Sequence, residues 1–116
     1  MPEHKSVLII EDESVIALDI QEMLYKNGFD ALVASNAEEA LRILGDRKVD
    51  MAIVDFFLGH GNATEIALAL KKRGVPFLLC SATLAFKDIE TDAFDAVPFL
   101  QKPFSDQQLL DLLASL

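Results

Sequence analysis

The sequence is poor in cysteine and in basic residues. Its single cysteine, Cys80, excludes an internal disulfide and any zinc site built from several cysteines. The chain carries 10 Lys and Arg against 19 Asp and Glu, which gives a formal net charge of −9. No basic run is longer than the short one at 71–73. This charge distribution argues against nucleic-acid binding, which needs a basic patch or stripe.

The sequence also lacks a long apolar run, and its first residues lead us to expect no signal peptide. Its apolar runs are far shorter than the roughly 20 residues of a membrane-spanning helix. The N-terminal MPEHKSVLII has no small-residue cleavage site. No repeat, low-complexity tract or linker divides the chain, and a hydrophobic fraction of 52% is enough for a real core. We therefore expect one cytoplasmic domain over residues 1–116, without a membrane partner.

Short apolar runs alternate with segments of helical character. The runs predicted as strands are 6–10, 30–34, 51–54, 76–80 and 97–100. The segments predicted as helices are 15–27, a segment capped within 35–39, 62–71, a weaker helix within 85–94, and a final helix capped at 105–108. Because the strands are apolar on both faces, the pattern predicts a doubly wound α/β domain, a five-stranded parallel sheet with helices on both faces.

Polar residues follow four of the predicted strands. Glu11 and Asp12 follow the first strand, Asp55 the third, Ser81 the fourth and Lys102 the fifth. Because the carboxyl ends of parallel strands open on one edge of a sheet, we expect these side chains to converge there. Three neighbouring carboxylates repel one another unless a cation intervenes, and a hard divalent ion such as Mg²⁺ suits oxygen ligands. Asp55 alone would equally suit a solvated strand end or a helix cap.

Four segments, VLIIEDE, AIVDFFL, PFLLCSA and FLQKPF, occur in this order on the predicted strand–helix pattern. Together they resemble the response-regulator receiver domain of two-component signalling across essentially the whole chain. The resemblance implies a flavodoxin-like fold with strand order 2-1-3-4-5. It also implies that Asp55 accepts a phosphoryl group from a phosphohistidine of a sensor histidine kinase or histidine phosphotransfer protein.

The resemblance further implies a role for individual residues. Glu11, Asp12 and Asp55 would hold Mg²⁺ together with the backbone carbonyl of Phe57. The chain would be no enzyme beyond promoting its own aspartyl phosphorylation and dephosphorylation.

Three further residues complete the set that the resemblance implies. Ser81 and Lys102 would each contact a phosphoryl oxygen, and Lys102 would precede a cis peptide bond to Pro103. Phe99 would change position on activation, although an aromatic residue in a strand is as often simply part of the core. Output would then pass through contacts with a downstream protein.

Two alternatives remain open at this point. One is a protein-binding module of the same fold that no longer uses phosphate. The other is a flavodoxin-like cofactor binder, which would need a phosphate-cradling loop after the first strand. The sequence there is the acidic EDES, which disfavours a bound phosphate.

Overall fold

The computed structural model of the chain describes residues 5–56, 63–82 and 96–116. Five strands form one parallel sheet in the order β2-β1-β3-β4-β5. The strands are β1 (Ser6–Ile10), β2 (Asp30–Ala34), β3 (Met51–Asp55), β4 (Phe77–Ser81) and β5 (Phe99–Gln101). This order confirms the predicted doubly wound, flavodoxin-like sheet.

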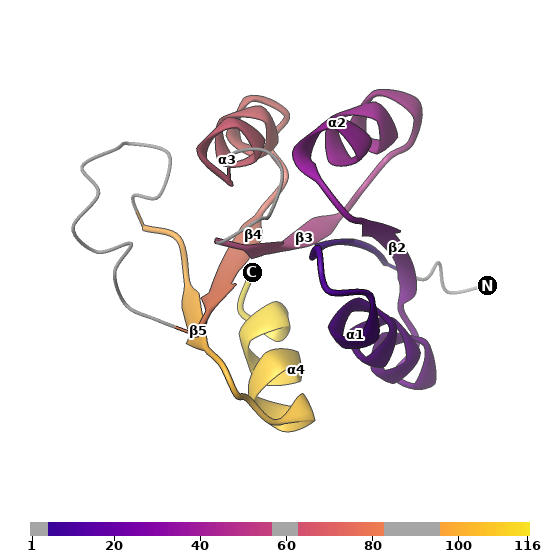
Figure 1. Cartoon of the computed structure of the whole chain (residues 1–116), viewed down its shortest axis with the longest axis vertical. Coiled ribbons are helices and arrows are strands. Elements are labelled where there is room, and N and C mark those ends of the chain that lie inside the picture. The colour runs from indigo at the N-terminus through magenta and orange to yellow at the C-terminus, as the bar shows by residue number, and fades with distance from the viewer. Residues whose placement is uncertain (1–4, 57–62, 83–95) are drawn as a thin grey trace.

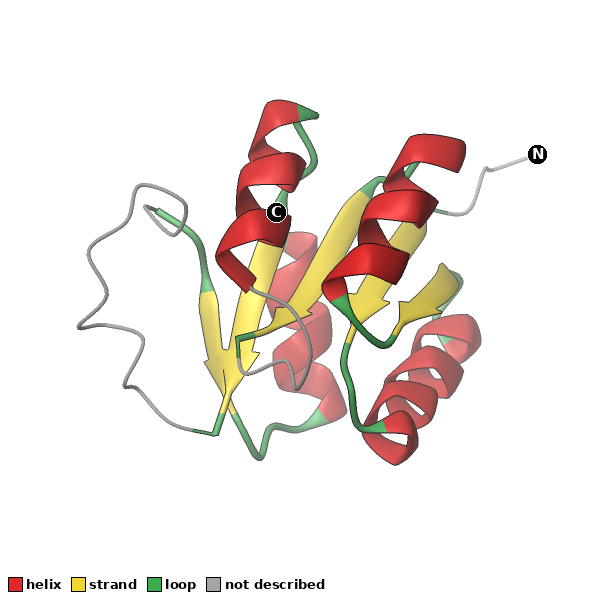
Figure 2. Ribbon diagram, turned by 45° about the horizontal axis from the view of Figure 1, so that its top comes forward, coloured by secondary structure: helices red, strands yellow, loops and turns green. Residues whose placement is uncertain are grey.

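Helices cover both faces of the sheet. They are α1 (Ser14–Lys26), α2 (Ala37–Asp46), α3 (Ala63–Lys72) and α4 (Asp106–Ala114). The helices α2 and α3 lie on one face, and α1 and α4 lie on the other (Figure 1). Figure 2 shows the sheet enclosed between these two helical layers. In the described part of the chain, no helix is long and apolar enough to cross a membrane.

The two faces of the sheet build two hydrophobic cores. Along β1, Leu8 and Ile10 pack into the core under α2 and α3, whereas Val7 and Ile9 pack into the core under α1 and α4. All four side chains are fully buried. Since successive strand residues point to opposite faces, an uninterrupted apolar run is what a strand between two helical layers requires.

The sequence also specifies where several helices begin and end. The Asn36 side chain accepts a hydrogen bond from the backbone N–H of Glu39 at 2.8 Å, and Ser105 and Gln108 form a reciprocal capping box at the start of α4. Gly28 and Gly74 follow α1 and α3 with φ of 85° and 69°, a conformation that favours glycine. These caps and stops confirm the predicted helix boundaries to within a few residues.

The last strand differs most from its prediction. The expected strand 97–100 is observed as Phe99–Gln101, because Pro98 has no N–H to donate to a sheet and stands just before the strand. The carbonyl of Pro98 still accepts a hydrogen bond from Leu79 N at 2.9 Å. The helix predicted within 85–94 lies outside the described residues.

Candidate functional site

Three carboxylates meet at the carboxyl edge of the sheet. Glu11 and Asp12 follow β1, and Asp55 is the last residue of the neighbouring strand β3. The register pairs Ile10 with Val54, so the next residues along the two strands, Glu11 and Asp55, lie side by side. Oxygen atoms of all three carboxylates lie within 4.8 Å of one another. The prediction that these residues converge is therefore confirmed.

The carboxylates differ in their exposure to solvent. Glu11 is 2% exposed and Asp55 is 6% exposed, whereas Asp12 is exposed. Buried carboxylates need compensating partners, because an isolated buried charge is very costly. Glu11 Oε1 accepts a hydrogen bond from the backbone N–H of Glu13 at 3.3 Å.

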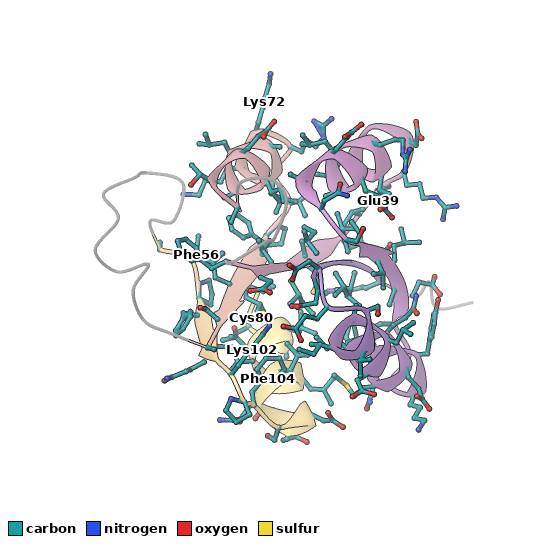
Figure 3. All side chains as sticks on the ribbon, in the orientation of Figure 1. Glu39, Phe56, Lys72, Cys80, Lys102 and Phe104 are labelled. Carbon is teal, nitrogen blue, oxygen red and sulfur yellow. The ribbon has the colours of Figure 1, made fainter. Side chains whose placement is uncertain are left out.

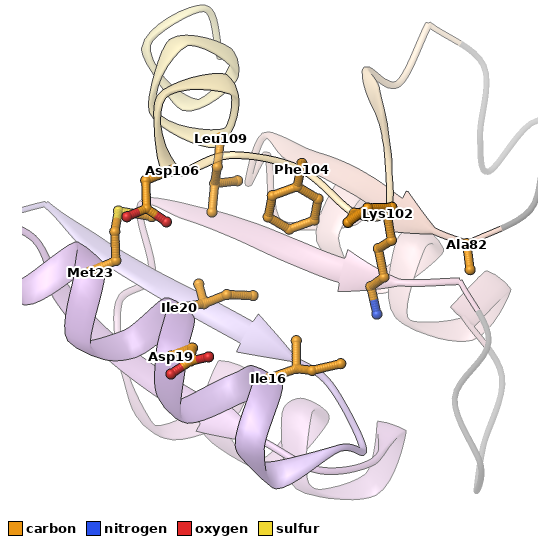
Figure 4. Close-up of a pocket in the computed structure, with 10 residues that line it drawn as sticks. Ile16, Asp19, Ile20, Met23, Ala82, Lys102, Phe104, Asp106 and Leu109 are labelled. Atoms are coloured by element: carbon orange, nitrogen blue, oxygen red, sulfur yellow. The ribbon is translucent and has the colours of Figure 1, made fainter.

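Lys102 supplies the positive charge. Its Nζ lies 3.0 Å from Oε2 of Glu11 and 3.3 Å from Oδ2 of Asp55. Lys102 follows β5, and its side chain extends toward the carboxyl ends of the other strands (Figure 4). The strand β5 lies beyond β4 from β3, so only a long side chain can reach Asp55. The Lys102–Pro103 peptide bond is cis, as expected.

Burial and charge set the protonation of this cluster. The pKa of Glu11 is raised from its ordinary value of 4.5 to about 7, first by burial and then by hydrogen bonding to Asp55, while Lys102 opposes the rise. Burial acts to lower the pKa of Lys102, but its hydrogen bond to Glu11 and the surrounding negative charges raise it above the ordinary value. Lys102 is therefore protonated at neutral pH, and its ammonium group is the counter-ion of both Glu11 and Asp55.

The donor set fits a hard divalent cation. Three carboxylates and one ammonium leave an excess negative charge when all are ionised, and every available ligand atom here is oxygen. Glu11, Asp12 and Asp55 are thus suited to Mg²⁺. The fourth expected ligand, the backbone carbonyl of Phe57, lies outside the described residues.

Ser81 ends β4 beside this cluster and is 1% exposed. Its backbone carbonyl accepts a hydrogen bond from Lys102 N at 2.8 Å, so the hydroxyl and amine residues occupy neighbouring strand ends. The preceding Cys80 packs in the core under α1 and α4, where burial raises the pKa of its thiol to about 12. Cys80 is therefore a small buried apolar residue.

Phe99 lies on β5, half-buried against the core under α2 and α3. The register pairs Phe99 with Leu79 and Gln101 with Ser81. Because side chains alternate along a strand, Ser81 and Phe99 belong to the same face of the sheet. This arrangement suits the switch, which stays a prediction.

An apolar groove adjoins Lys102, and the sequence analysis missed it. The groove has a volume of about 520 Å³ and lies between α1 and α4 (Figure 4). Ile16, Ile20, Phe104 and Leu109 are among the residues that line it. No single stretch of the sequence signals the groove, because Ile20 and Met23 of α1 also pack in the core and the other wall comes from residues that follow β5.

Comparison with known proteins decides the family. The sequence model of the response regulator receiver domain matches residues 7–114. The chain belongs to this family. Receiver domains are the phosphoacceptors of two-component signalling, and this is the function of the chain. They are not enzymes in the usual sense, they bind Mg²⁺ at an acidic pocket, and they partner with histidine kinases or phosphotransfer proteins.

Curated relatives agree with this assignment. The alkaline phosphatase synthesis transcriptional regulatory protein PhoP of Bacillus subtilis is 29% identical over 111 residues, covering 91% of this chain and 45% of the relative. The phosphate regulon transcriptional regulatory protein PhoB of Pseudomonas aeruginosa is 29% identical over 114 residues, covering 91% and 48%. This receiver chain spans about half the length of these relatives.

Solved receiver structures share the fold. A CheY-like receiver domain protein from Methanospirillum hungatei superposes with a TM-score of 0.86 at 22% identity, covering 97% of this chain and 93% of that one. The response regulator TrrA of Thermotoga maritima, solved in complex with Mg²⁺ and BeF, superposes with a TM-score of 0.84 at 24% identity, covering 96% and 97%.

Proposed function

We propose that Asp55 is the residue of this receiver domain that accepts the phosphoryl group. The observation that carries the proposal is the position of the Lys102 ammonium, within ion-pair distance of both Asp55 and Glu11. A carboxylate that receives a phosphoryl group needs a nearby cation, because the transferring group spreads negative charge over its oxygens. Asp55 pairs with Lys102, and a carboxylate oxygen of Asp55 also lies within 4.8 Å of carboxylate oxygens of Glu11 and Asp12.

We further propose that Glu11, Asp12 and Asp55 hold Mg²⁺, with the Phe57 carbonyl as another ligand. When bound, Mg²⁺ supplies positive charge that offsets the charge of the phosphoryl oxygens. The resemblance in fold to TrrA, which was solved with Mg²⁺ and BeF, supports this assignment. The position of Asp12, exposed at the rim of the cluster, leaves it accessible to an arriving ion.

In the transfer itself, an oxygen of Asp55 forms a bond to phosphorus while the bond from phosphorus to the donor's imidazole nitrogen breaks. Lys102 pairs with one phosphoryl oxygen, and the Ser81 hydroxyl donates a hydrogen bond to another. Burial of Asp55 and Ser81 excludes most water from these contacts. Catalysis is then chiefly positioning and charge neutralisation, and the chain promotes only its own phosphorylation and dephosphorylation.

The phosphohistidine donor, a sensor kinase or phosphotransfer protein, must reach Asp55 from the open edge of the sheet. Val15 and Leu18 on α1 are 73% and 58% exposed beside this edge. The groove next to Lys102, which neither residue lines, is a second apolar surface near the same edge, and apolar surfaces of this kind suit a protein partner. We propose that the donor docks there.

We also propose that phosphorylation is read out through Ser81 and Phe99. A charged phosphoryl oxygen attracts the Ser81 hydroxyl more strongly than a neutral acceptor does. Its movement would leave space on the face of the sheet that Phe99 shares, and Phe99 would move inward to fill it. The altered surface would then favour one state of a downstream partner.

The decisive experiment is incubation with Mg²⁺ and a small acyl-phosphate donor, followed by intact mass measurement. The wild-type chain should gain the mass of one phosphoryl group, which hydroxylamine removes, and Asp55→Asn should gain none. A stably phosphorylated Asp55→Asn protein would refute the assignment of Asp55. No mass gain in wild type would instead favour a receiver-fold binding module that does not use phosphate.

A further inference from the structure

The chain is acidic, yet its basic residues gather at one place. Five of its 10 Lys and Arg residues lie at the ends of α2 and α3. We call these the basic patch: Arg47, Lys48, Lys71, Lys72 and Arg73. The helices α2 and α3 lie side by side on one face of the sheet, and Lys72 extends away from α3 (Figures 1 and 3).

A groove runs through the basic patch. It has a volume of about 450 Å³, and Arg47, Lys48 and Arg73 line it together with apolar Val49 and Val75. Asp50 also lines this groove, but its Oδ2 accepts a hydrogen bond from the backbone N–H of Ser6 at 2.7 Å. The groove thus has apolar walls, three cations and one carboxylate that already has a partner.

A second groove continues from the first. The two grooves share Gly74 and Val75, and the second has a volume of about 570 Å³. Pro98 and Leu116 contribute to its apolar lining. The two grooves therefore adjoin at the turn formed by Gly74 and Val75.

Among the described residues, no acidic side chain forms an ion pair with the lining cations. Across residues 5–56, 63–82 and 96–116, no ion pair involves Arg47, Lys48 or Arg73, and all three side chains are exposed. The helix dipole favours cations near a helix C-terminus, which accounts for Lys71 and Lys72 in the last turn of α3. It does not account for an apolar groove between two such helix ends.

The backbone here offers little to a small anion. The N–H groups of Arg47, Arg73, Gly74 and Val75 all donate to carbonyls of the preceding helical turn, at 2.9 to 3.1 Å. The helices also direct their negative dipole ends toward the groove. A phosphate ion would therefore find no cradle of N–H groups, and charge recognition must come from the long side chains.

The overall charge restricts the occupant further. A net charge of −9 repels a long polyanion such as nucleic acid and also repels a second copy of the chain. A short acidic segment senses mainly the local patch, because salt screens charges beyond about 8–10 Å. An apolar side chain in such a segment would fit against Val49 and Val75.

We propose that the basic patch and its groove bind a short acidic segment of a partner protein that carries an apolar anchor residue. The patch lies at the amino ends of the strands: Asp50 precedes β3 and Pro76 precedes β4, whereas Asp55 and Ser81 end these strands. Five residues of strand place the two sites about 16 Å apart. The partner therefore binds whether or not Asp55 carries a phosphoryl group, and it leaves the carboxyl edge open to a phosphodonor.

The test uses the whole chain and a fluorescent synthetic peptide in which Asp and Glu flank a single Leu. Anisotropy should show saturable binding that weakens with salt, and amide NMR shifts should cluster at residues 44–50 and 71–75. Arg73→Glu should weaken binding about tenfold, equivalent to about 1.4 kcal/mol. The matched control is Arg42→Glu, which changes the net charge equally at an exposed α2 residue outside the groove and should bind like wild type.

Several outcomes would overturn the proposal. Equal weakening by Arg42→Glu would indicate attraction to general charge alone, and equal binding after replacing the peptide's Leu with Ser would exclude the apolar anchor. Tighter binding of duplex DNA at the same residues would identify nucleic acid as the occupant. Self-association that Arg73→Glu abolishes would identify a second copy of the chain. Lys48→Glu repeats the test if Arg73→Glu melts earlier than wild type.

Discussion

Lys102 lies closer to Glu11 than to Asp55: its Nζ is 3.0 Å from Glu11 Oε2 and 3.3 Å from Asp55 Oδ2. The amine proposed to hold the phosphoryl group is therefore also the counter-ion of a proposed metal ligand. Phosphorylation of Asp55 and ion binding at Glu11 consequently act on the same ammonium. A change of charge at either residue should therefore alter the electrostatic environment of the other.

Mg²⁺ should stabilise the fold through the three carboxylates. At about a hundredfold excess over its dissociation constant, a ligand specific for the folded state adds about 2.7 kcal/mol to the free energy of unfolding. Thermal unfolding with and without Mg²⁺ measures this gain, and Asp12→Asn should largely remove it. Asp19→Asn makes the same charge change on α1 outside the cluster and should keep the gain. A melting curve that Mg²⁺ leaves unmoved would contradict the proposed site.

Removal of the Lys102 ammonium should destabilise the chain and impair phosphorylation. Lys102→Ala leaves Glu11 and Asp55 buried without their cation, which should lower the free energy of unfolding by about 1–3 kcal/mol. Proton uptake by Glu11 limits this loss, because it removes one of the two unpaired charges. Chemical denaturation measures the cost, and intact mass measures phosphorylation. The matched control is Lys26→Ala, which removes an exposed 3.3 Å pair with Glu22 and should cost at most about 1 kcal/mol. If both variants lose the same free energy of unfolding, the ion pairs of Lys102 contribute no more to stability than an exposed surface pair.

With a metal chelator present, the contribution of Glu11 to stability should fall as pH rises. The pKa of Glu11 is about 7 in the folded chain against an ordinary 4.5, so the folded state binds this proton more tightly than the unfolded state. Its contribution is complete below pH 4.5 and is lost as pH rises through about 7. At about 1.4 kcal/mol per pKa unit, the loss is at most about 3 kcal/mol.

Glu11→Gln should remove this pH dependence, because the amide does not titrate. The quantity to compare is the difference in the free energy of unfolding between wild type and Glu11→Gln at pH 5, 6, 7 and 8. Carboxylates remote from Glu11 are common to both proteins and cancel in that difference, whereas Asp55 interacts with Glu11 and belongs to the measured effect. A difference that is constant over this range would show that Glu11 titrates at its ordinary pKa.

A phosphoryl mimic should alter the surface around Phe99. With Mg²⁺ and beryllofluoride, amide NMR shifts should extend from the site through β5 to α4, and Ser81→Ala should restrict them to the site. A change in population from 1:99 to 99:1 requires about 5.5 kcal/mol of differential stabilisation, and smaller changes remain measurable. If shifts stop at the loops near Asp55, the chain would carry phosphate without switching.

The fold was predictable because the central strands are apolar on both faces, capping side chains begin α2 and α4, and glycines follow α1 and α3. The convergence of Glu11, Asp12, Asp55 and Lys102 followed from a general property of parallel sheets, whose carboxyl ends share one edge. The distances within the cluster did not follow, because they depend on side-chain conformation. The prediction for β5 was displaced because Pro98 is compatible with an extended chain but cannot take part fully in a sheet ladder.

The grooves could not be predicted from the sequence. Arg47 and Arg73 stand far apart along the chain, and only the packing of α2 against α3 brings their helix ends together. The run at 71–73 by itself suggested nothing more than a short basic stretch. The apolar groove beside Lys102 likewise combines residues of α1 with residues that follow β5.

The backbone hydrogen bond from Lys102 N to Ser81 O, 2.8 Å long, has a mechanical consequence. This hydrogen bond fixes the backbone positions from which the Ser81 hydroxyl and the Lys102 ammonium extend. The two backbones cannot separate without breaking this hydrogen bond, so any adjustment to an incoming group must come from rotation about side-chain bonds. The backbones of Ser81 and Lys102 therefore keep a fixed relative position beside the carboxylates at the ends of β1 and β3.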